Sequence, residues 1–227
     1  MTEQLYAHPV SQPARAVHWL CKLNDYAIEY KYVNVVKGET HTEEFKEINP
    51  MGKIPVLKDG LFVLTESHAI MIYLAEKHGW SAWYPSDPQI RARIHEYMNW
   101  HHHYARRSSE LFVNMLKTKI GQSSPAVEAV LKRKDRTLRD IFHMMEHWLR
   151  QSNGIYLLTS SHPSLADLSC YSEVAQLEAL GLLKELDLTF PRVAGWLKRM
   201  KQLPHHDEQF AAMIKFFRKF ELMPAKL

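Results

Sequence analysis

The sequence predicts an α/β region followed by an all-helical region, so the expected fold class is α/β plus all-α. Three observations support this division. Strand-like and helical runs alternate up to about Gly79, a stretch of prolines and aromatic residues without periodicity follows, and no later segment has a strand pattern. We therefore expect an N-terminal domain over residues 1–79, a linker over 80–87 and an all-helical domain over 88–227.

Composition places the chain among ordinary globular proteins. Of its 227 residues, 46% are hydrophobic and 24% are charged, which excludes a disordered chain. The 29 basic and 25 acidic residues give a net charge of +4 and are scattered, so nucleic acid is not an expected partner. No apolar run approaches membrane-spanning length, so no membrane partner is expected either. Two cysteines, Cys21 and Cys170, indicate a reducing compartment such as the cytoplasm.

The first elements have the order strand, helix, strand. Residues 4–7 and 30–36 are rich in aromatic and β-branched residues, which is typical of strands. Between them, residues 12–23 carry Ala16, Val17, Leu20 and Leu23 at helical spacing. This pattern predicts a βαβ unit at the start of the chain.

A hairpin and a helix complete the first domain. Two short apolar runs, residues 56–58 and 61–64, flank Asp59-Gly60, a strong signal for a two-residue hairpin turn. An amphipathic stretch then begins at Ser67 and ends before Gly79, the glycine expected just past a helix. With a short helix before the hairpin, the predicted order of the domain is βαβαββα.

About five helices are predicted for the second domain. Asp87 caps a helix that has Pro88 at its first position and whose pattern continues through residue 112. A second long helix covers residues 125–151. Ser164 and Asp167 form a capping box that opens a third helix. Pro191 and Pro204 punctuate two further helices.

Five segments carry a family resemblance that covers nearly the whole chain in order. They are residues 10–17 (VSQPARAV), 49–57 (NPMGKIPVL), 65–67 (TES), 106–107 (RR) and 164–167 (SLAD). Together they resemble a glutathione S-transferase, most of all one of the theta class. The resemblance implies a thioredoxin-like N-terminal domain, a helical domain that contributes an electrophile pocket, glutathione as co-substrate, and a homodimer.

The activity implied is conjugation of the glutathione thiolate to apolar electrophiles, with glutathione-dependent peroxidase activity as a second reaction. Two alternatives remain open. One is a non-catalytic protein-interaction module, because a fold alone does not fix function. The other is a glutathione-dependent haloalkane dehalogenase, which halide release would reveal.

Ser11 is the candidate catalytic residue. A free thiol has a pKa of about 8.5, so the enzyme must stabilise the thiolate at neutral pH. Ser11 lies between the first strand and the following helix, where its hydroxyl and the helix amides can point at an anion. Tyr6 is the rival, because other classes of the family place a thiol-activating tyrosine near this point. A helix-capping role for Ser11 is the third interpretation.

The resemblance also implies a set of glutathione contacts. Ile54-Pro55 resembles the family's cis-proline site, where the backbone of Ile54 pairs with the cysteinyl part of glutathione. Ser67 is expected to bind the γ-glutamyl carboxylate, and Glu66 to face the neighbouring ammonium group. The glycine carboxylate is expected near three further residues, Lys53, Thr40 and His41.

The electrophile side is predicted from residues of the helical domain. Arg106 or Arg107 would face the cleft and steady the thiolate or a departing anion such as halide or sulfate. Tyr104, Phe112 and Met115 are candidates for an apolar electrophile pocket, although core packing explains such residues as well.

Two further features concern metals and localisation. His101, His102 and His103 diverge by about 100° each on a helix, and His143 with His147 lacks a third ligand, so no metal is expected. The C-terminal tripeptide, residues 225–227 (AKL), resembles a peroxisomal address, which makes the peroxisome an alternative to the cytoplasm.

Overall fold

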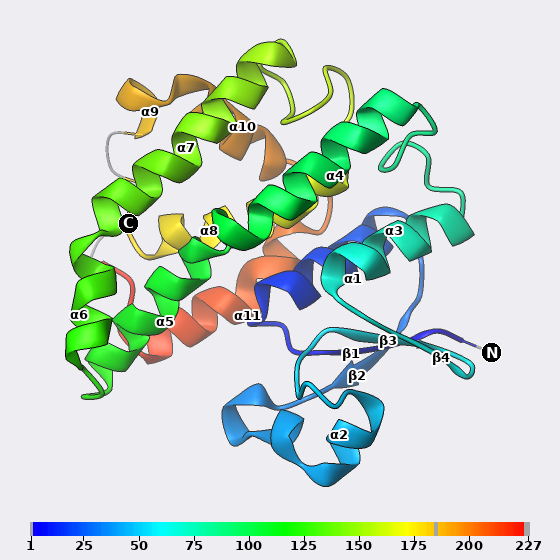
Figure 1. Ribbon diagram of the computed structural model, residues 1–227, viewed down its shortest axis with the longest axis horizontal. Coiled ribbons are helices and arrows are strands. Elements are labelled where there is room, and N and C mark those ends of the chain that lie inside the picture. The colour runs from blue at the N-terminus through cyan, green and yellow to red at the C-terminus, as the bar shows by residue number, and fades with distance from the viewer. Residues whose placement is uncertain (1, 184–185, 225–227) are drawn as a thin grey trace.

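The computed structural model describes residues 2–183 and 186–224. Its N-terminal part is a four-stranded mixed sheet with the strand order β2-β1-β3-β4 (Figure 1). β1 pairs in parallel with β2 and antiparallel with β3, and β3 pairs antiparallel with β4. The strands are β1 (Gln4–Ala7), β2 (Glu29–Tyr32), β3 (Val56–Asp59) and β4 (Phe62–Thr65).

Helices cover both faces of this sheet. α1 (Gln12–Leu23) and α3 (Ser67–Lys77) lie on one face and α2 (Glu43–Ile48) on the other, as Figure 1 shows. The α/β prediction and its element order are confirmed. The predicted strand over residues 30–36 is too long, because the chain turns into two short 3-10 helices, Val35–Lys37 and Glu39–His41, after β2 ends at Tyr32.

The alternation along β1 divides its side chains between two hydrophobic clusters. Leu5 and Ala7 are fully buried in the main core beneath α1 and α3. The side chain of Tyr6 points to the opposite face, where it packs with Val33, Phe45 and Val56. Tyr6 is therefore turned toward the face that carries α2.

The second part contains eight helices within the described residues. α8 is buried along most of its length and packs against α1, so it joins the two parts of the molecule. The helices are α4 (Pro88–His103), α5 (Arg107–Lys119), α6 (Pro125–Lys132), α7 (Lys134–Gln151), α8 (Leu165–Ala179), α9 (Leu186–Thr189), α10 (Pro191–Met200) and α11 (His206–Lys219).

The two predicted long helices are each divided in two. The helix expected over residues 88–112 breaks after His103, because Tyr104 leaves the helical conformation and the Arg106 amide bonds back to His101. The helix expected over residues 125–151 breaks at Arg133, which ends α6 and begins α7. Short breaks preserve the apolar period, so the pattern alone did not reveal them.

The predicted capping motif at the start of α8 is confirmed. The Asp167 carboxylate accepts a hydrogen bond from the Ser164 amide at 2.8 Å. It also accepts from the Leu157 amide at 2.9 Å and from Trp196 Nε1 at 2.8 Å. Burial raises the pKa of this carboxyl group, while the donors around it oppose that rise. Asp167 thus ties the start of α8 to the preceding loop and to α10.

Three observations concern membrane-spanning helices, the two cysteines and the C-terminal tripeptide. No helix among residues 2–183 and 186–224 combines the length and the apolar character needed to cross a bilayer. Cys21 and Cys170 are free and buried, and burial raises the pKa of the Cys21 thiol to about 12. The tripeptide at residues 225–227 lies outside the described residues.

Candidate active site

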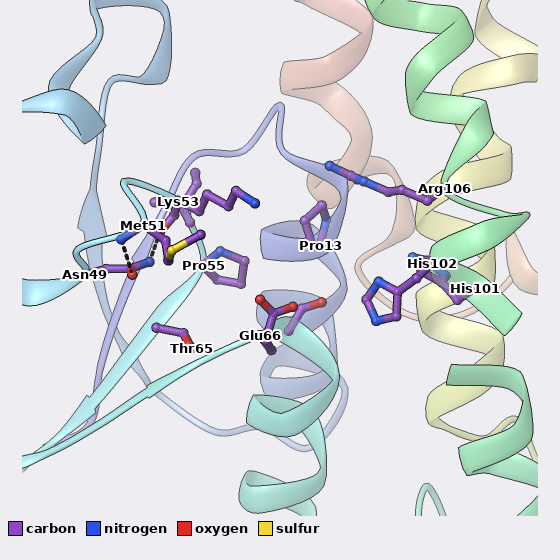
Figure 2. Close-up of a pocket in the computed structure, with 12 residues that line it drawn as sticks. Pro13, Asn49, Met51, Lys53, Pro55, Thr65, Glu66, His101, His102 and Arg106 are labelled. Carbon is purple, nitrogen blue, oxygen red and sulfur yellow. Dashed lines mark hydrogen bonds between the residues drawn. The ribbon is translucent and has the colours of Figure 1, made fainter. Parts of the chain in front are cut away.

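A cavity of about 210 Å³ lies where the two parts of the molecule meet (Figure 2). One wall comes from the loop before β3 and from the β4–α3 junction. The other wall comes from the end of α4 and the residues that follow it, and Pro13 of α1 lies between the two walls. The full lining is Pro13, Asn49, Met51, Lys53, Ile54, Pro55, Thr65, Glu66, Ser67, His101, His102 and Arg106.

The loop before β3 is held by its own hydrogen bonds. Asn49 Nδ2 donates to the Lys53 carbonyl at 2.7 Å, and the Met51 amide donates to Asn49 Oδ1 at 3.1 Å. Gly52 has φ 59°, and a Cβ there would lie 2.8 Å from the Thr40 carbonyl, so the close approach requires glycine. The Ile54-Pro55 peptide that follows is cis. In Figure 2 the amino group of Lys53 points into the cavity.

The β4–α3 junction presents the start of a helix to the cavity. Glu66 precedes α3 with φ 65° and ψ 113°, a conformation that is rare outside glycine. Such backbone strain costs about 1–3 kcal/mol and is concentrated at functional sites. Ser67 is the first residue of α3, where backbone amides have no partner within the helix and favour an anion. The junction is therefore suited to bind a carboxylate.

Ser11 occupies the N-cap position of α1, two residues before Pro13. Its amide donates to the His8 carbonyl at 2.9 Å, and its side chain makes no capping hydrogen bond. The hydrogen bond that a simple helix-capping role for Ser11 would require is therefore absent. Ser11 is not among the residues that line the cavity, although Pro13 in the first turn of α1 is.

A buried arginine fixes the loop that leads to Ser11. Arg15 is 2% exposed and donates to the Pro9 carbonyl at 3.1 Å and to the Ser172 carbonyl of α8 at 2.9 Å. Burial lowers the pKa of Arg15 to about 10, and nearby Glu173 opposes that fall, so the guanidinium stays charged at neutral pH. Arg15 thus holds the loop before α1 against the helical part of the molecule.

His101 and His102 of α4 form part of the wall opposite α3, and His68 of α3 lies buried beside them. His68 Nε2 lies 2.7 Å from Ser169 Oγ, which lies 3.3 Å from His101 Nδ1. Burial lowers the pKa of His68 to about 3 and also lowers that of His101, with smaller contributions from neighbouring His102 and Arg106. Both buried imidazoles are therefore neutral at physiological pH. His102 lines the cavity from an exposed position.

Of the two adjacent arginines, only Arg106 lines the cavity. Its Nη1 atom donates to Glu173 Oε1 at 2.6 Å, and Figure 2 shows its guanidinium end above Pro13. Arg107 instead lies over the ring of Tyr104 at 5.5 Å, and that ring stacks on Trp100. Arg106 has helical backbone angles just before α5 begins at Arg107, so the two consecutive side chains point in directions about 100° apart.

The structure brings together five of the predicted glutathione-contact residues, namely Lys53, Ile54, Pro55, Glu66 and Ser67. Thr40 and His41 lie behind Gly52, outside the cavity lining. On the electrophile side, Tyr104 and Met115 do not line the cavity. Phe112 is 7% exposed and packs against Phe217 at 4.9 Å, so it belongs to the core of the helical part.

Six lining residues were not among the predicted contacts. Asn49, Met51 and Thr65 fall inside the segments that carried the family resemblance, so their positions could have been inferred from their neighbours. In the sequence, His101 and His102 suggest only a test for metal ligands, and Pro13 is only one residue of the motif at 10–17. Among the described residues, no three His, Cys, Asp or Glu side chains converge on a point that could hold a metal.

Two family models match this chain. The model described as "Glutathione S-transferase, N-terminal domain" matches residues 5–82, and "Glutathione S-transferase, C-terminal domain" matches residues 111–206. Glutathione S-transferase T1 of Arabidopsis thaliana is 35% identical, over 97% of this chain and 93% of that protein. Human glutathione S-transferase theta-2 is 39% identical, over 87% of this chain and 80% of that protein. The chain belongs to the theta-class glutathione S-transferases.

Solved structures agree with this assignment. A human theta-2 transferase in complex with glutathione superposes on this transferase with a TM-score of 0.82 and 35% identity, over 98% and 92% of the two chains. A human theta-class transferase in complex with the glutathione conjugate of 1-menaphthyl sulfate gives the same TM-score and identity, over 97% and 91%. The thioredoxin-like N-terminal domain, the helical C-terminal domain and glutathione transferase activity follow from this membership.

Proposed function

We propose that the cavity binds glutathione along its N-terminal wall. The γ-glutamyl carboxylate would lie at the start of α3, with Ser67 as donor and Glu66 beside the ammonium group. The cysteinyl backbone would pair with Ile54, and the glycine carboxylate would meet Lys53, with Thr40 and His41 behind it. The observation that most supports glutathione binding is the strained backbone of Glu66, the residue that precedes α3 and lines the cavity.

Ser11 is the proposed thiolate-binding residue. Lowering a thiol pKa by two units requires about 2.7 kcal/mol, which a hydroxyl donor and a helix N-terminus together supply. The Ser11 hydroxyl makes no capping hydrogen bond and stands at the N-terminus of α1. The rival Tyr6 packs on the opposite face of the sheet, and its hydroxyl donates to Gln4 Oε1 at 3.3 Å. These positions favour Ser11 over Tyr6.

The proposed reaction is nucleophilic substitution at an apolar electrophile. The glutathione S–H proton leaves to solvent, the thiolate forms the new C–S bond, and the bond to the leaving group breaks with its electron pair. Arg106 is a charged group of the helical wall, so it would stabilise the negative charge of the departing anion. An arylmethyl sulfate such as 1-menaphthyl sulfate therefore suits the site, with sulfate as the leaving group.

The test combines binding with product release. Calorimetric titration with S-methylglutathione should show one site per chain, and 1-menaphthyl sulfate with glutathione should release sulfate. Halide release from a small haloalkane, faster than sulfate release, would favour the dehalogenase, and reduction of an organic hydroperoxide would establish the peroxidase reaction. Absence of S-methylglutathione binding would overturn the proposed function.

A homodimer is proposed for the assembly. The hairpin between β3 and β4 exposes consecutive apolar side chains, with Leu61 99%, Phe62 47% and Val63 39% exposed. Exposed apolar patches of this kind mark protein contacts. Sedimentation should give twice the chain mass, and Leu61→Asp should shift the protein toward monomer. Leu188→Asp, at another leucine that is 83% exposed, is the matched control and should leave the mass unchanged.

For localisation we propose the cytoplasm, with the peroxisome as the alternative supported by the tripeptide at residues 225–227. A fluorescent reporter fused ahead of this tripeptide tests the alternative. A diffuse signal supports the cytoplasm, and a punctate signal that coincides with a peroxisomal marker supports the peroxisome.

A further inference from the structure

Glu173 is a buried carboxylate on α8 with both of its oxygens occupied. It is 1% exposed. Its Oε1 atom accepts from Arg106 Nη1 at 2.6 Å. Its Oε2 atom accepts from Ser109 Oγ at 2.5 Å and from Gln176 Nε2 at 3.1 Å. A buried carboxylate is retained only when its partners satisfy it in this way, because removing it from water is costly.

The hydrogen-bond network around Glu173 also includes Gln12, the residue that follows Ser11. Gln12 Nε2 donates to Gln176 Oε1 at 2.5 Å, and Gln12 Oε1 lies 3.5 Å from Arg106 Nη1. Arg106, Glu173, Gln176 and Gln12 therefore close a ring that joins the helical wall of the cavity to the first turn of α1. Three of the four side chains are buried, whereas that of Arg106 is 44% exposed at the cavity.

We propose that Glu173 is a positioning residue for Arg106. Its carboxylate holds the guanidinium over the first turn of α1, where the leaving group would acquire negative charge. A free arginine side chain samples many rotamers, and a fixed charge-assisted bond removes that freedom before the reaction begins. A charge oriented in advance stabilises the transition state without reorganisation. This inference rests on the proposed function.

A purely structural role makes a different prediction. If Glu173 only joined α5 to α8 through Ser109, its loss would lower stability and would act independently of Arg106. If Glu173 acts through Arg106, its loss has no further effect once Arg106 is gone. A double-mutant cycle in activity separates the two roles, because independent effects multiply and coupled effects do not.

The experiment uses Glu173→Gln, Arg106→Gln and the double variant. The readouts are kcat for sulfate release from 1-menaphthyl sulfate, KM for glutathione, and Tm. Each single variant should lower kcat about tenfold, as expected for one lost charge-assisted bond, with KM for glutathione changed less than twofold. The double variant should match Arg106→Gln. Reduction of a hydroperoxide, which releases no sulfate, should fall by less.

Two further variants control the interpretation. Glu146 is a carboxylate on α7 that accepts from Arg192 Nη1 at 3.0 Å on another side of the helical part, so Glu146→Gln should leave kcat within twofold. Ser109→Ala keeps the Glu173 carboxylate and removes a hydroxyl that donates to Glu173 Oε2 at 2.5 Å and accepts from Arg106 Nη1 at 3.3 Å. It should lower kcat about threefold, and it should have no effect in the Arg106→Gln background.

The outcomes are distinguishable. An active wild-type enzyme whose kcat is unchanged by Glu173→Gln, or a double variant whose loss is the product of the two single losses, overturns this inference alone. A wild-type protein that releases no sulfate and binds no S-methylglutathione overturns the proposed function as well.

Discussion

The two walls of the cavity are built in different ways. On the N-terminal wall, the groups proposed to bind glutathione are largely backbone amides and carbonyls at the Ile54-Pro55 turn and at the start of α3, fixed by local hydrogen bonds and by the Glu66 backbone. On the helical wall, the group proposed to stabilise the leaving group is the long side chain of Arg106, which bonds to Glu173, 67 residues away in the chain.

This difference predicts how each wall responds to mutation. Backbone groups survive the truncation of a side chain, so the N-terminal wall should tolerate many substitutions with modest loss. A side chain held by other side chains depends on each of them, so the helical wall should respond strongly to single changes in the buried network. The following predictions test that contrast, from the largest expected effect to the smallest.

The largest effect should come from Asp167, which anchors the helix that carries Glu173. Asp167→Ala leaves the Leu157 amide, the Ser164 amide and Trp196 Nε1 without their acceptor. The free energy of unfolding should fall by about 3 kcal/mol, measured by urea denaturation. Asp140→Ala, at an exposed position on α7, is the control and should stay within about 0.5 kcal/mol of wild type. An equal loss in both variants would contradict the anchoring role.

The next effect is a pH dependence from His68. In the unfolded chain a histidine takes up a proton below about pH 6.5, whereas burial lowers the pKa of His68 in the folded protein to about 3. The unfolded state therefore binds more protons in this range, and stability falls as the pH drops. From pH 7 to pH 5 His68 should contribute a loss of roughly 2 kcal/mol.

His68→Gln should remove that contribution in urea denaturation at the two pH values. His103→Gln, which changes an exposed side chain on α4, is the control and should keep the wild-type dependence. A wild-type pH dependence retained in His68→Gln would show that other buried groups, such as His101, carry it.

The two adjacent arginines offer a matched pair on the helical wall. Arg106→Gln should lower kcat for sulfate release about tenfold, which corresponds to about 1.4 kcal/mol. Arg107→Gln should change it less than twofold, because Arg107 lies over Tyr104 outside the cavity lining. Equal losses in the two variants would contradict this distinction between Arg106 and Arg107.

The smallest effect concerns the backbone of the N-terminal wall. Glu66→Gly should relieve the strain at φ 65° and raise the free energy of unfolding by about 1 kcal/mol. It should also weaken S-methylglutathione binding severalfold, because the carboxylate proposed to face the ammonium group is lost. Denaturation and calorimetry measure the two effects, and a variant that loses stability would contradict the account of strain.

The difference between the two walls explains why the residues of the N-terminal wall could be predicted from the sequence. The N-terminal wall consists of neighbouring residues such as Lys53, Ile54 and Pro55, or Glu66 and Ser67, so a local motif identifies them together. The strand and helix order of the first domain also follows from local periodicity and from the Asp59-Gly60 turn, as the structure confirms.

The helical wall could not be predicted in the same way. Glu173, Gln176 and Gln12 are separated by up to 164 residues, and their polar side chains look like surface residues in the sequence although they are buried. The choice between Arg106 and Arg107 depends on the helix break at Tyr104, which the apolar period did not reveal. Non-local contacts of this kind become visible only once the helices are packed.

The most direct test of the central claim is the pKa of the thiol of bound glutathione, followed by thiolate absorbance during a pH titration. We expect this pKa to lie well below that of free glutathione in the wild type and to return toward the free value in Ser11→Ala, while Tyr6→Phe leaves it lowered. A recovery in Tyr6→Phe with no change in Ser11→Ala would contradict the account and move thiolate stabilisation to Tyr6.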